Sequence, residues 1–264
     1  MNPLLTEIKI RDDMGITKTL TERITTQKGS ECRMNVLVAC EESQRVCTAF
    51  RERGFTAFSA DIQEPSGGHP EWHILGDVLK VLNGGKFRTM DGTKHMVDKW
   101  DLIIAHPPCT YLSNAGARHL YADGELNQKR YKKGVKGKDF FMKFLNADCK
   151  HIAVENPIPS RVYKLPKYNQ VIQPYMFGHP FTKKTCFWLV GLPTLYPTNE
   201  VKPIATWCPS GSYSHKHDIK HKGVFTTDRA KNRSKTFEGI AQAMAQQWGD
   251  YLTGKTDRQL SFFD

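Results

Sequence analysis

The sequence predicts an α/β protein built on a doubly wound, mostly parallel sheet. Buried-strand patterns at residues 35–40, 55–60 and 101–105 are separated by segments with helical spacing or turn residues. The first two strands enclose a helix, and the second strand ends in an acid, Asp61, which is the typical opening of such a sheet. The length of 264 residues suits one large domain or one domain with an insert.

The composition indicates which kind of partner the protein binds and in which cellular compartment it folds. A net charge of +11 favours a polyanionic partner, with nucleic acid ahead of a generically basic protein. The chain has 7 cysteines without the spacing of a disulfide framework, which fits a reducing compartment. No apolar run approaches a membrane span and residues 1–33 are polar and charged, so we expect no membrane association and a cytoplasmic protein, in a bacterial host cell.

The N-terminal part divides into an extension and the start of the main domain. Residues 1–34 show little apolar periodicity and are predicted to be an extension, either a docking arm or the product of an upstream start site. The strand at 35–40 is followed by Ser43 as a helix cap and by Gly54 as the end of the helix. Val46, Cys47 and Phe50 form the buried face of this helix.

The middle of the chain supplies further strands, each followed by polar residues. The segment 74–79 offers a short strand that ends at Asp77, and 101–105 is the next strand. Residues 114–138 are polar and rich in lysine, which is typical either of a mobile loop over a phosphate backbone or of a solvated loop. A helix around 140–145 then leads to a strand at 151–154.

The last third is predicted as loop, strand, insert and helix. Residues 158–182 resemble a loop, and 185–190 a strand that completes a catalytic core spanning 35–191. A short, basic recognition insert follows at 192–235. The amphipathic pattern of 236–252 indicates a core helix, and 253–264 a flexible tail. The apolar stripe of the helix consists of Phe237, Ile240, Ala241, Met244, Ala245, Trp248 and Leu252.

Two strand ends carry a reactive pair. Pro107 and Pro108 stop the strand at 101–105 and hold Cys109 on a stiff loop, at the sheet edge where chemistry occurs. Glu155 ends the strand at 151–154, so a carboxyl group is expected in the same cleft. A thiolate that adds to a ring carbon, with an acid at a ring nitrogen, suits an electron-poor heterocycle, provided that the pKa of the thiol is lowered.

These motifs resemble the DNA cytosine carbon-5 methyltransferases, which use S-adenosylmethionine, and indicate a compact, phage-like member. The family's Pro-Cys nucleophile is matched by Pro108-Cys109, and its Glu-Asn pair by Glu155-Asn156. Its cofactor acids are matched by Asp61 and Asp77. The resemblance covers roughly residues 34–252 in order and implies a Rossmann-like class I methyltransferase fold with a small recognition insert.

The resemblance also implies a mechanism and a set of site residues. A cytosine is flipped out of double-stranded DNA, Cys109 attacks carbon 6, Glu155 engages nitrogen 3, and carbon 5 takes the methyl group. The expected cofactor-binding residues are Cys40, Glu41, Ser43, Asp61, Asp77 and Pro107. The expected substrate-binding residues are Asn156, Lys183, Lys184 and Thr185.

The chain departs from the family in its first loop and in its insert. The family's glycine-rich loop is replaced by residues 40–43, without glycine, so that cofactor contacts fall to side chains such as Glu41 or Ser43. The insert is too small to read two grooves in detail, which predicts short or relaxed sequence specificity.

Three rival functions stay open. Methylation of an exocyclic amino group is the first, because that chemistry uses a Pro-Pro-aromatic loop after the same strand and this chain has both prolines. A non-catalytic DNA-binding descendant of the fold is the second, and a mononucleotide substrate is the third.

Two further patterns lie outside the core. Cys208, His215, His217 and His221 match no standard zinc spacing, so we expect no metal, with zinc as the alternative. Gln259, Leu260, Phe262 and Phe263 resemble the short peptide by which bacterial replication and repair proteins bind the sliding clamp. The other interpretation of these residues is a tail that packs on the domain.

Overall fold

The computed structural model describes residues 6–11, 17–22, 34–117, 119–207, 222–224 and 233–255. The chain divides into two compact units, 1–33 and 34–264, which are described separately. In the first unit, β1 (Thr6–Arg11) pairs antiparallel with β2 (Thr17–Glu22). The rest of this section concerns the second unit.

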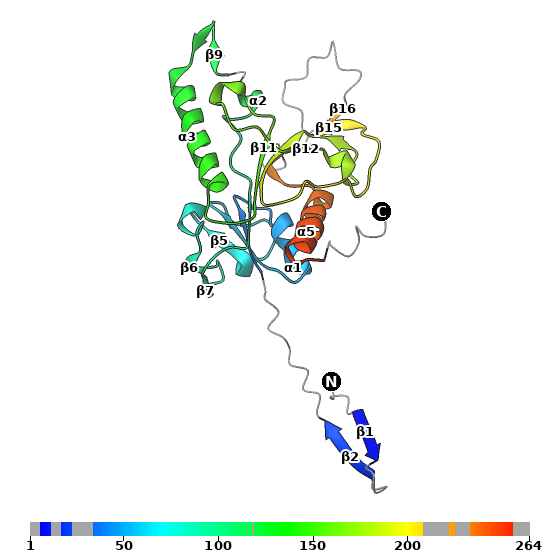
Figure 1. Cartoon of the computed structure of the whole chain (residues 1–264). Coiled ribbons are helices and arrows are strands. Elements are labelled where there is room, and N and C mark those ends of the chain that lie inside the picture. The colour runs from blue at the N-terminus through cyan, green and yellow to red at the C-terminus, as the bar shows by residue number, and fades with distance from the viewer. Residues whose placement is uncertain are drawn as a thin grey trace. The chain divides into compact units, whose positions relative to one another are not determined.

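A seven-stranded, mostly parallel sheet forms the centre of the second unit (Figure 1). Its order is β12-β14-β11-β8-β3-β4-β5. The strand β14 runs antiparallel to both of its neighbours, β11 and β12, and the other strands of the sheet share one direction. The α/β class with a mostly parallel sheet is therefore confirmed. The strands are β3 (Asn35–Ala39), β4 (Thr56–Asp61), β5 (His73–Leu75), β8 (Leu102–Ala105), β11 (Ile152–Pro157), β12 (Gln170–Ile172) and β14 (Thr185–Val190).

The strand order reverses at β3. From β3 the chain adds β4 and β5 on one side, then crosses to add β8 and β11 on the other. In such sheets ligands bind at the carboxyl ends of the strands beside this reversal. The loops after β3 and β8 therefore border the expected site.

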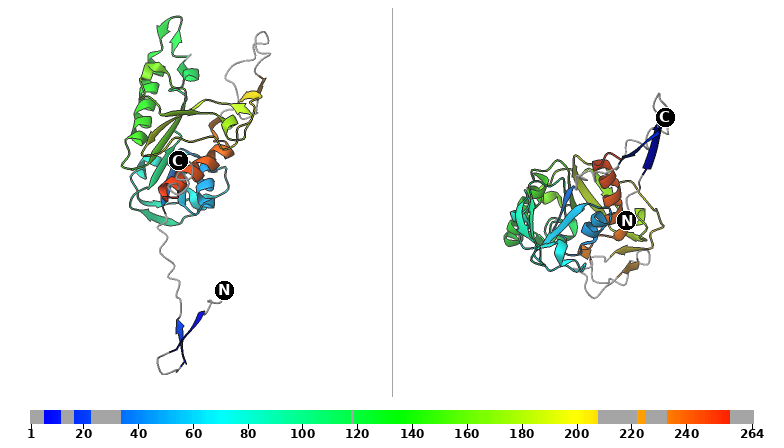
Figure 2. Two further views of the ribbon diagram at one scale, coloured as in Figure 1. Left: turned by 45° about the vertical axis from the view of Figure 1, so that its right-hand side comes forward. Right: turned by 90° about the horizontal axis from the view of Figure 1, so that it is seen from below.

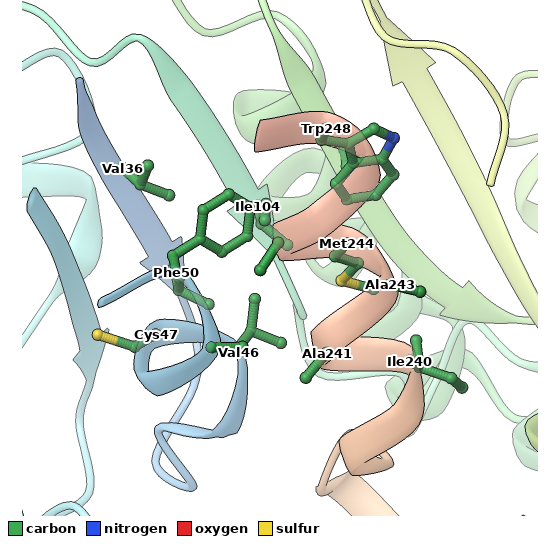
Figure 3. Close-up of a cluster of buried hydrophobic side chains, with 14 of the residues drawn as sticks. Val36, Val46, Cys47, Phe50, Ile104, Ile240, Ala241, Ala243, Met244 and Trp248 are labelled. Carbon is green, nitrogen blue, oxygen red and sulfur yellow. The ribbon is translucent and has the colours of Figure 1, made fainter. Parts of the chain in front are cut away.

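Continuous apolar runs form the central strands because both faces of the sheet are covered. Val36–Ala39 and Leu102–Ala105 are fully buried. One face packs against α1 (Arg45–Glu52) and α5 (Glu238–Leu252), whose side chains meet in Figure 3. The other face packs against α3 (Gln128–Leu145) and the hairpin of β6 (Gly85–Arg88) and β7 (Lys94–Val97), as Figure 2 also shows.

The start of α1 differs from the expectation. Ser43 was predicted to cap this helix, but the helix begins at Arg45, and Glu41 takes the capping role. The two carboxylate oxygens of Glu41 accept hydrogen bonds from the backbone N–H groups of Val46 (2.7 Å) and Cys47 (3.1 Å). Glu41 lies four residues before the start of α1, and the left-handed backbone of Gln44, with φ of 57°, turns the chain so that the Glu41 side chain reaches these amides.

The lysine-rich segment 114–138 is not a continuous loop, because α3 covers its second half. Gly134 and Gly137 both lie within α3. A Cβ at Gly134 would overlap the ring of Tyr163, whereas one at Gly137 would make an ordinary contact, 3.6 Å from Leu112 Cγ. Gly134 is therefore required by close packing, and neither glycine ends the helix.

The remaining elements are short. They are η1 (Pro70–Trp72), η2 (Val78–Lys80), α2 (Asn114–Ala117), β9 (Tyr121–Ala122), β10 (Glu125–Leu126), η3 (Arg161–Tyr163) and η4 (Pro174–Met176). A separate sheet has the order β13-β15-β16 and consists of β13 (Phe181–Thr182), β15 (Ala205–Trp207) and β16 (Lys222–Val224). The predicted loop at 158–182 thus contains η3, β12 and η4.

Two predictions fall outside the described part of the chain. Cys208, His215, His217 and His221 lie between β15 and β16, and the tail residues Gln259, Leu260, Phe262 and Phe263 lie beyond α5; neither set is described. Among the described residues, no cluster of His, Cys, Asp and Glu has the arrangement of a metal site. Within the same residues, none of the helices has the length and apolar character needed to cross a membrane.

Candidate active site at the carboxyl edge of the sheet

The loop after β8 brings Cys109 to the carboxyl edge of the sheet. The His106 N–H donates to the Ala39 carbonyl oxygen at 2.9 Å, so the loop leaves β8 attached to the end of β3. Pro107 is buried beneath the loop. The Cys109 carbonyl then accepts from the N–H groups of Leu112 (3.1 Å) and Ser113 (3.0 Å). Cys109 is therefore held on a fixed turn, as the two prolines predicted.

Glu155 lies at the end of the neighbouring strand, close enough to act on the Cys109 thiol, and beside a residue that the sequence did not single out. The strands β8 and β11 are parallel neighbours, with Ala105 paired to Val154. His106 Nδ1 lies 3.4 Å from Glu155 Oε2, and the two side chains are only 7% and 18% exposed. The sequence offered one signal for His106, which is that it directly precedes the Pro-Pro-Cys loop.

The charges around Glu155 keep its carboxyl group ionised. Burial alone would raise the pKa of Glu155, but the hydrogen bond to His106 and the Lys183 ammonium outweigh burial and lower this pKa below its usual value. Near neutral pH, Glu155 is thus a hydrogen-bond acceptor and a proton acceptor.

The Cys109 thiol is protonated in the free protein. Burial raises the pKa of Cys109, and the Glu155 carboxylate raises it further, while Lys183 and Arg233 act in the opposite direction. The lowered pKa that a nucleophilic cysteine requires is therefore not present before a ligand binds. The same interactions place the thiol, the carboxylate and the two cations in one electrostatic neighbourhood.

The predicted substrate-binding residues occupy different positions. Lys183 Nζ donates to the Arg233 carbonyl oxygen at 2.7 Å and lies 6.0 Å from the centre of the Phe237 ring. Thr185 is buried, and its Oγ1 donates to the Lys183 carbonyl at 3.2 Å, so it shapes the turn that carries Lys183. Lys184 is exposed.

Asn156 is buried between β11 and β14. It pairs with Cys186 across the two strands, and its Nδ2 donates to the Pro157 carbonyl at 2.6 Å. Its Oδ1 has no hydrogen-bond partner among the described residues. Asn156 therefore supports the loop after β11 and keeps one buried acceptor available.

The predicted cofactor residues gather at the ends of β3, β4 and β5. Burial raises the pKa of Cys40, and the carboxylates of Asp61 and Asp77 raise it further, which places both acids beside this thiol. One oxygen of each acid binds its own loop: Asp61 Oδ1 accepts from the Gln63 N–H at 2.9 Å, and Asp77 Oδ1 from the Leu79 N–H at 3.0 Å. Three strand ends thus contribute to one acidic neighbourhood.

The two glutamates in the loop after β3, Glu41 and Glu42, differ in the hydrogen bonding of their carboxylates. Both oxygens of Glu41 are used in capping α1, so its carboxylate is committed to the fold. Glu42 is only 6% exposed, and neither of its carboxylate oxygens has a hydrogen-bond partner among the described residues. Such a buried acceptor pair is costly without a donor, so Glu42 is a stronger ligand candidate than Glu41.

Apolar surface next to the acids is a further feature that sequence analysis missed. Ile62 directly follows Asp61 and is 79% exposed, and Leu75 at the end of β5 is 46% exposed. Separately, a cleft of about 700 Å³ opens between α1 and the N-terminal end of α5, where Ser43 and His179 line it. The described lining of this cleft does not include Cys109 or Glu155.

The fold and the site together define a doubly wound α/β protein with reactive and acidic groups at the ends of its central strands. No protein-family model matches the chain. No curated protein matches its sequence. Among solved structures, a methyltransferase of Entamoeba histolytica, EhMeth, is 16% identical, with a TM-score of 0.39 over 64% of this chain and 58% of that one. The match thus extends over less than two thirds of that protein's length.

Proposed function

We propose that this protein transfers a methyl group from S-adenosylmethionine to carbon 5 of cytosine in DNA, through a covalent adduct at Cys109. The observation that carries the proposal is the pairing of Cys109 and Glu155 at the ends of neighbouring parallel strands. A thiol and a carboxylate that lie close enough to interact are the two groups that addition to a cytosine ring needs. The overall charge of +11 supports a nucleic-acid substrate.

The cluster at β3, β4 and β5 supports S-adenosylmethionine as the cofactor. An acid that ends the second strand suits the ribose hydroxyl groups, and this position is occupied by Asp61. Exposed apolar side chains at Ile62 and Leu75 suit a purine ring. The orphaned carboxylate of Glu42 suits a cationic amine. When bound, the cofactor would supply an electrophilic methyl group.

The protonation states of Cys109 and Glu155 suggest where the thiol proton goes in the first step. The Cys109 thiol is protonated and the Glu155 carboxylate is ionised. As the sulfur forms its bond to carbon 6, the thiol proton passes to the carboxylate, which delivers it to ring nitrogen 3. The ring then carries its extra electron density at carbon 5, ready to accept the methyl group. The contact with His106 orients Glu155 for this transfer.

The proposal is tested by incubating the protein with isotopically labelled S-adenosylmethionine and DNA, followed by digestion to nucleosides. We expect labelled 5-methylcytosine, and we expect Cys109→Ser to abolish it. Cys149→Ser is the matched control, since Cys149 donates to the carbonyls of Trp100 and His151, away from the site. Full activity in Cys109→Ser would refute the covalent mechanism. Methylation mapped to a long, strict sequence would refute the expected short specificity.

Transfer to an exocyclic amino group is the second candidate. The raised pKa of Cys109 favours it, because that reaction needs no thiolate and the two prolines after β8 are present. The same nucleoside digest discriminates the two reactions. Labelled N6-methyladenine or N4-methylcytosine that persists in Cys109→Ser would establish the second candidate.

A further inference from the structure

Helix α3 presents a stripe of lysines along one side. The exposed members are Lys129, Lys132, Lys133, Lys136 and Lys143, which we call the α3 lysine stripe. At 3.6 residues per turn they fall within a sector about 100° wide. The buried residues Gly134, Phe141 and Phe144 occupy a different sector, so the stripe borders the packed face without being part of it.

The N-terminal part of the stripe, from Lys129 to Lys136, is arranged against the stability of the helix. Lysines spaced three or four residues apart repel one another, and cations near a helix N-terminus oppose the helix dipole. The first turn of α3 contains no acid to compensate. A concentration of charge that the fold itself disfavours points to an anionic partner.

The lysine stripe is fixed to the loop that carries Cys109. Arg130, which is half-buried, donates from Nη2 to the Gly116 carbonyl at 2.9 Å, and its guanidinium lies 5.0 Å from the centre of the Tyr111 ring. Lys133 Nζ lies 5.9 Å from the same ring. The close approaches at Gly134 and Gly137 attach the helix to η3 and to Leu112.

The direction of α3 brings the lysine-rich end of the helix to the active edge. The helix leads into the amino end of β11, so its N-terminal half lies toward the carboxyl edge of the sheet, next to β9 (Figure 1). From Lys129 to Lys143 the helix rises about 21 Å, which equals the rise of about six nucleotides of one DNA strand.

We propose that the α3 lysine stripe binds the phosphate backbone of duplex DNA and holds it beside the Cys109 loop. The identity of the polyanion as DNA rests on the proposed function. The contacts are to phosphates and therefore independent of base sequence, which agrees with a small recognition insert. The stripe sets where the duplex lies, and the cleft around Cys109 selects the base.

The test measures binding of a fluorescein-labelled 30-base-pair duplex by anisotropy over a range of salt concentrations. In Lys133→Gln/Lys136→Gln, loss of two phosphate contacts reduces the slope of log K against log salt by about 1.8. It weakens binding by roughly 10- to 60-fold at about 0.1 M salt. The control is Lys86→Gln/Lys94→Gln, which removes the same charge from exposed positions on the β6–β7 hairpin. We expect the control to bind like the wild type.

The outcomes separate this inference from the proposed function. An unchanged slope in Lys133→Gln/Lys136→Gln, an equal loss in the control, or a wild type without affinity for the duplex overturns the inference. Binding through the stripe without methyl transfer overturns the proposed function and leaves the inference standing. The variant relieves repulsion but also loses the contact of Lys133 with the Tyr111 ring, so its melting temperature should stay close to that of the wild type. A large fall in melting temperature would attribute the binding loss to misfolding and count against the inference.

Discussion

The charges around Cys109 make its alkylation rate a direct test of the site. Glu155 raises the pKa of the thiol, and Lys183 lowers it. Replacing Glu155 by Gln removes the first influence and should speed the reaction of Cys109 with iodoacetamide. Replacing Lys183 by Met removes the second and should slow it. The two substitutions therefore move the same rate in opposite directions.

The size of the effect follows from the thiolate fraction. An ordinary cysteine is about 3% thiolate at neutral pH, and Cys109 lies below this because its pKa is raised. A charge in close range shifts a pKa by about one to three units, and each unit changes the thiolate fraction about tenfold. Lower basicity also reduces nucleophilicity, which leaves a net gain of about threefold per unit. We therefore expect Glu155→Gln to react about three to thirty times faster.

Peptide mass spectrometry of the alkylated protein supplies the measurement and its internal reference. Cys149 is also a partly buried thiol with a raised pKa, but Glu155 is not among the groups that affect it. The ratio of Cys109 to Cys149 alkylation at about pH 7.5 thus isolates the local effect. A ratio unchanged or lowered in Glu155→Gln would show that the thiol and the carboxylate do not share a cleft.

Three further predictions concern stability and cofactor binding. His106→Gln should lower the free energy of unfolding at pH 7 by about 1–3 kcal/mol. The pKa of Glu155 is lowered in the folded protein, so the stabilisation by His106 depends on the ionised carboxylate. Urea denaturation should therefore show the full loss of stability in His106→Gln above the unfolded-state pKa of Glu155. The loss should vanish as the pH falls through the folded-state pKa of Glu155. Asp61→Asn should weaken S-adenosylmethionine binding about 10- to 100-fold by calorimetry, since a charged hydrogen bond is lost; unchanged affinity would remove Asp61 from the site. Gly134→Ala should cost about 1–3 kcal/mol by overlap with the η3 phenol ring, whereas Gly137→Ala, whose Cβ would make an ordinary contact at 3.6 Å, should not destabilise; equal melting temperatures would contradict the α3 packing.

The sheet could be predicted because its central strands are buried on both faces. Continuous apolar runs such as Leu102–Ala105 leave a signal that needs no knowledge of their neighbours. The edge strand β12 was missed because three residues at a sheet edge carry no such run. The amphipathic pattern of α5 was equally clear, since Ile240, Met244 and Trp248 are all buried.

Helix α3 shows where local signals fail. The polar, lysine-rich composition of residues 114–138 favoured a loop, although the segment includes helical residues such as Gly134 and Gly137. The missing information was tertiary, because Tyr163 and Leu112 approach these positions from elsewhere in the chain. A similar limit applies to the cap of α1, where the left-handed backbone at Gln44 allows Glu41 to replace Ser43.

The positions of four candidate residues at strand ends could be predicted, but the charges that surround them could not. Cys109, Glu155, Asp61 and Asp77 lie at strand ends, where the topology gathers them. The sign of each pKa shift depends on distances between loops, and the sequence does not contain those distances. The expected low pKa of Cys109 is thus replaced by a raised one.

His106 links the two halves of the site, because it acts on carboxyl groups from the loop after β3 and from the end of β11. The Glu41 carboxylate that caps α1 is buried, which raises its pKa, and the His106 ring acts against that rise. The same ring contacts Glu155 at 3.4 Å, and its Nε2 is buried without a partner among the described residues. The His106 ring therefore acts to lower the pKa of two carboxyl groups, Glu41 in the loop after β3 and Glu155 at the end of β11. One side chain thus connects the cofactor-side loop with the acid near Cys109.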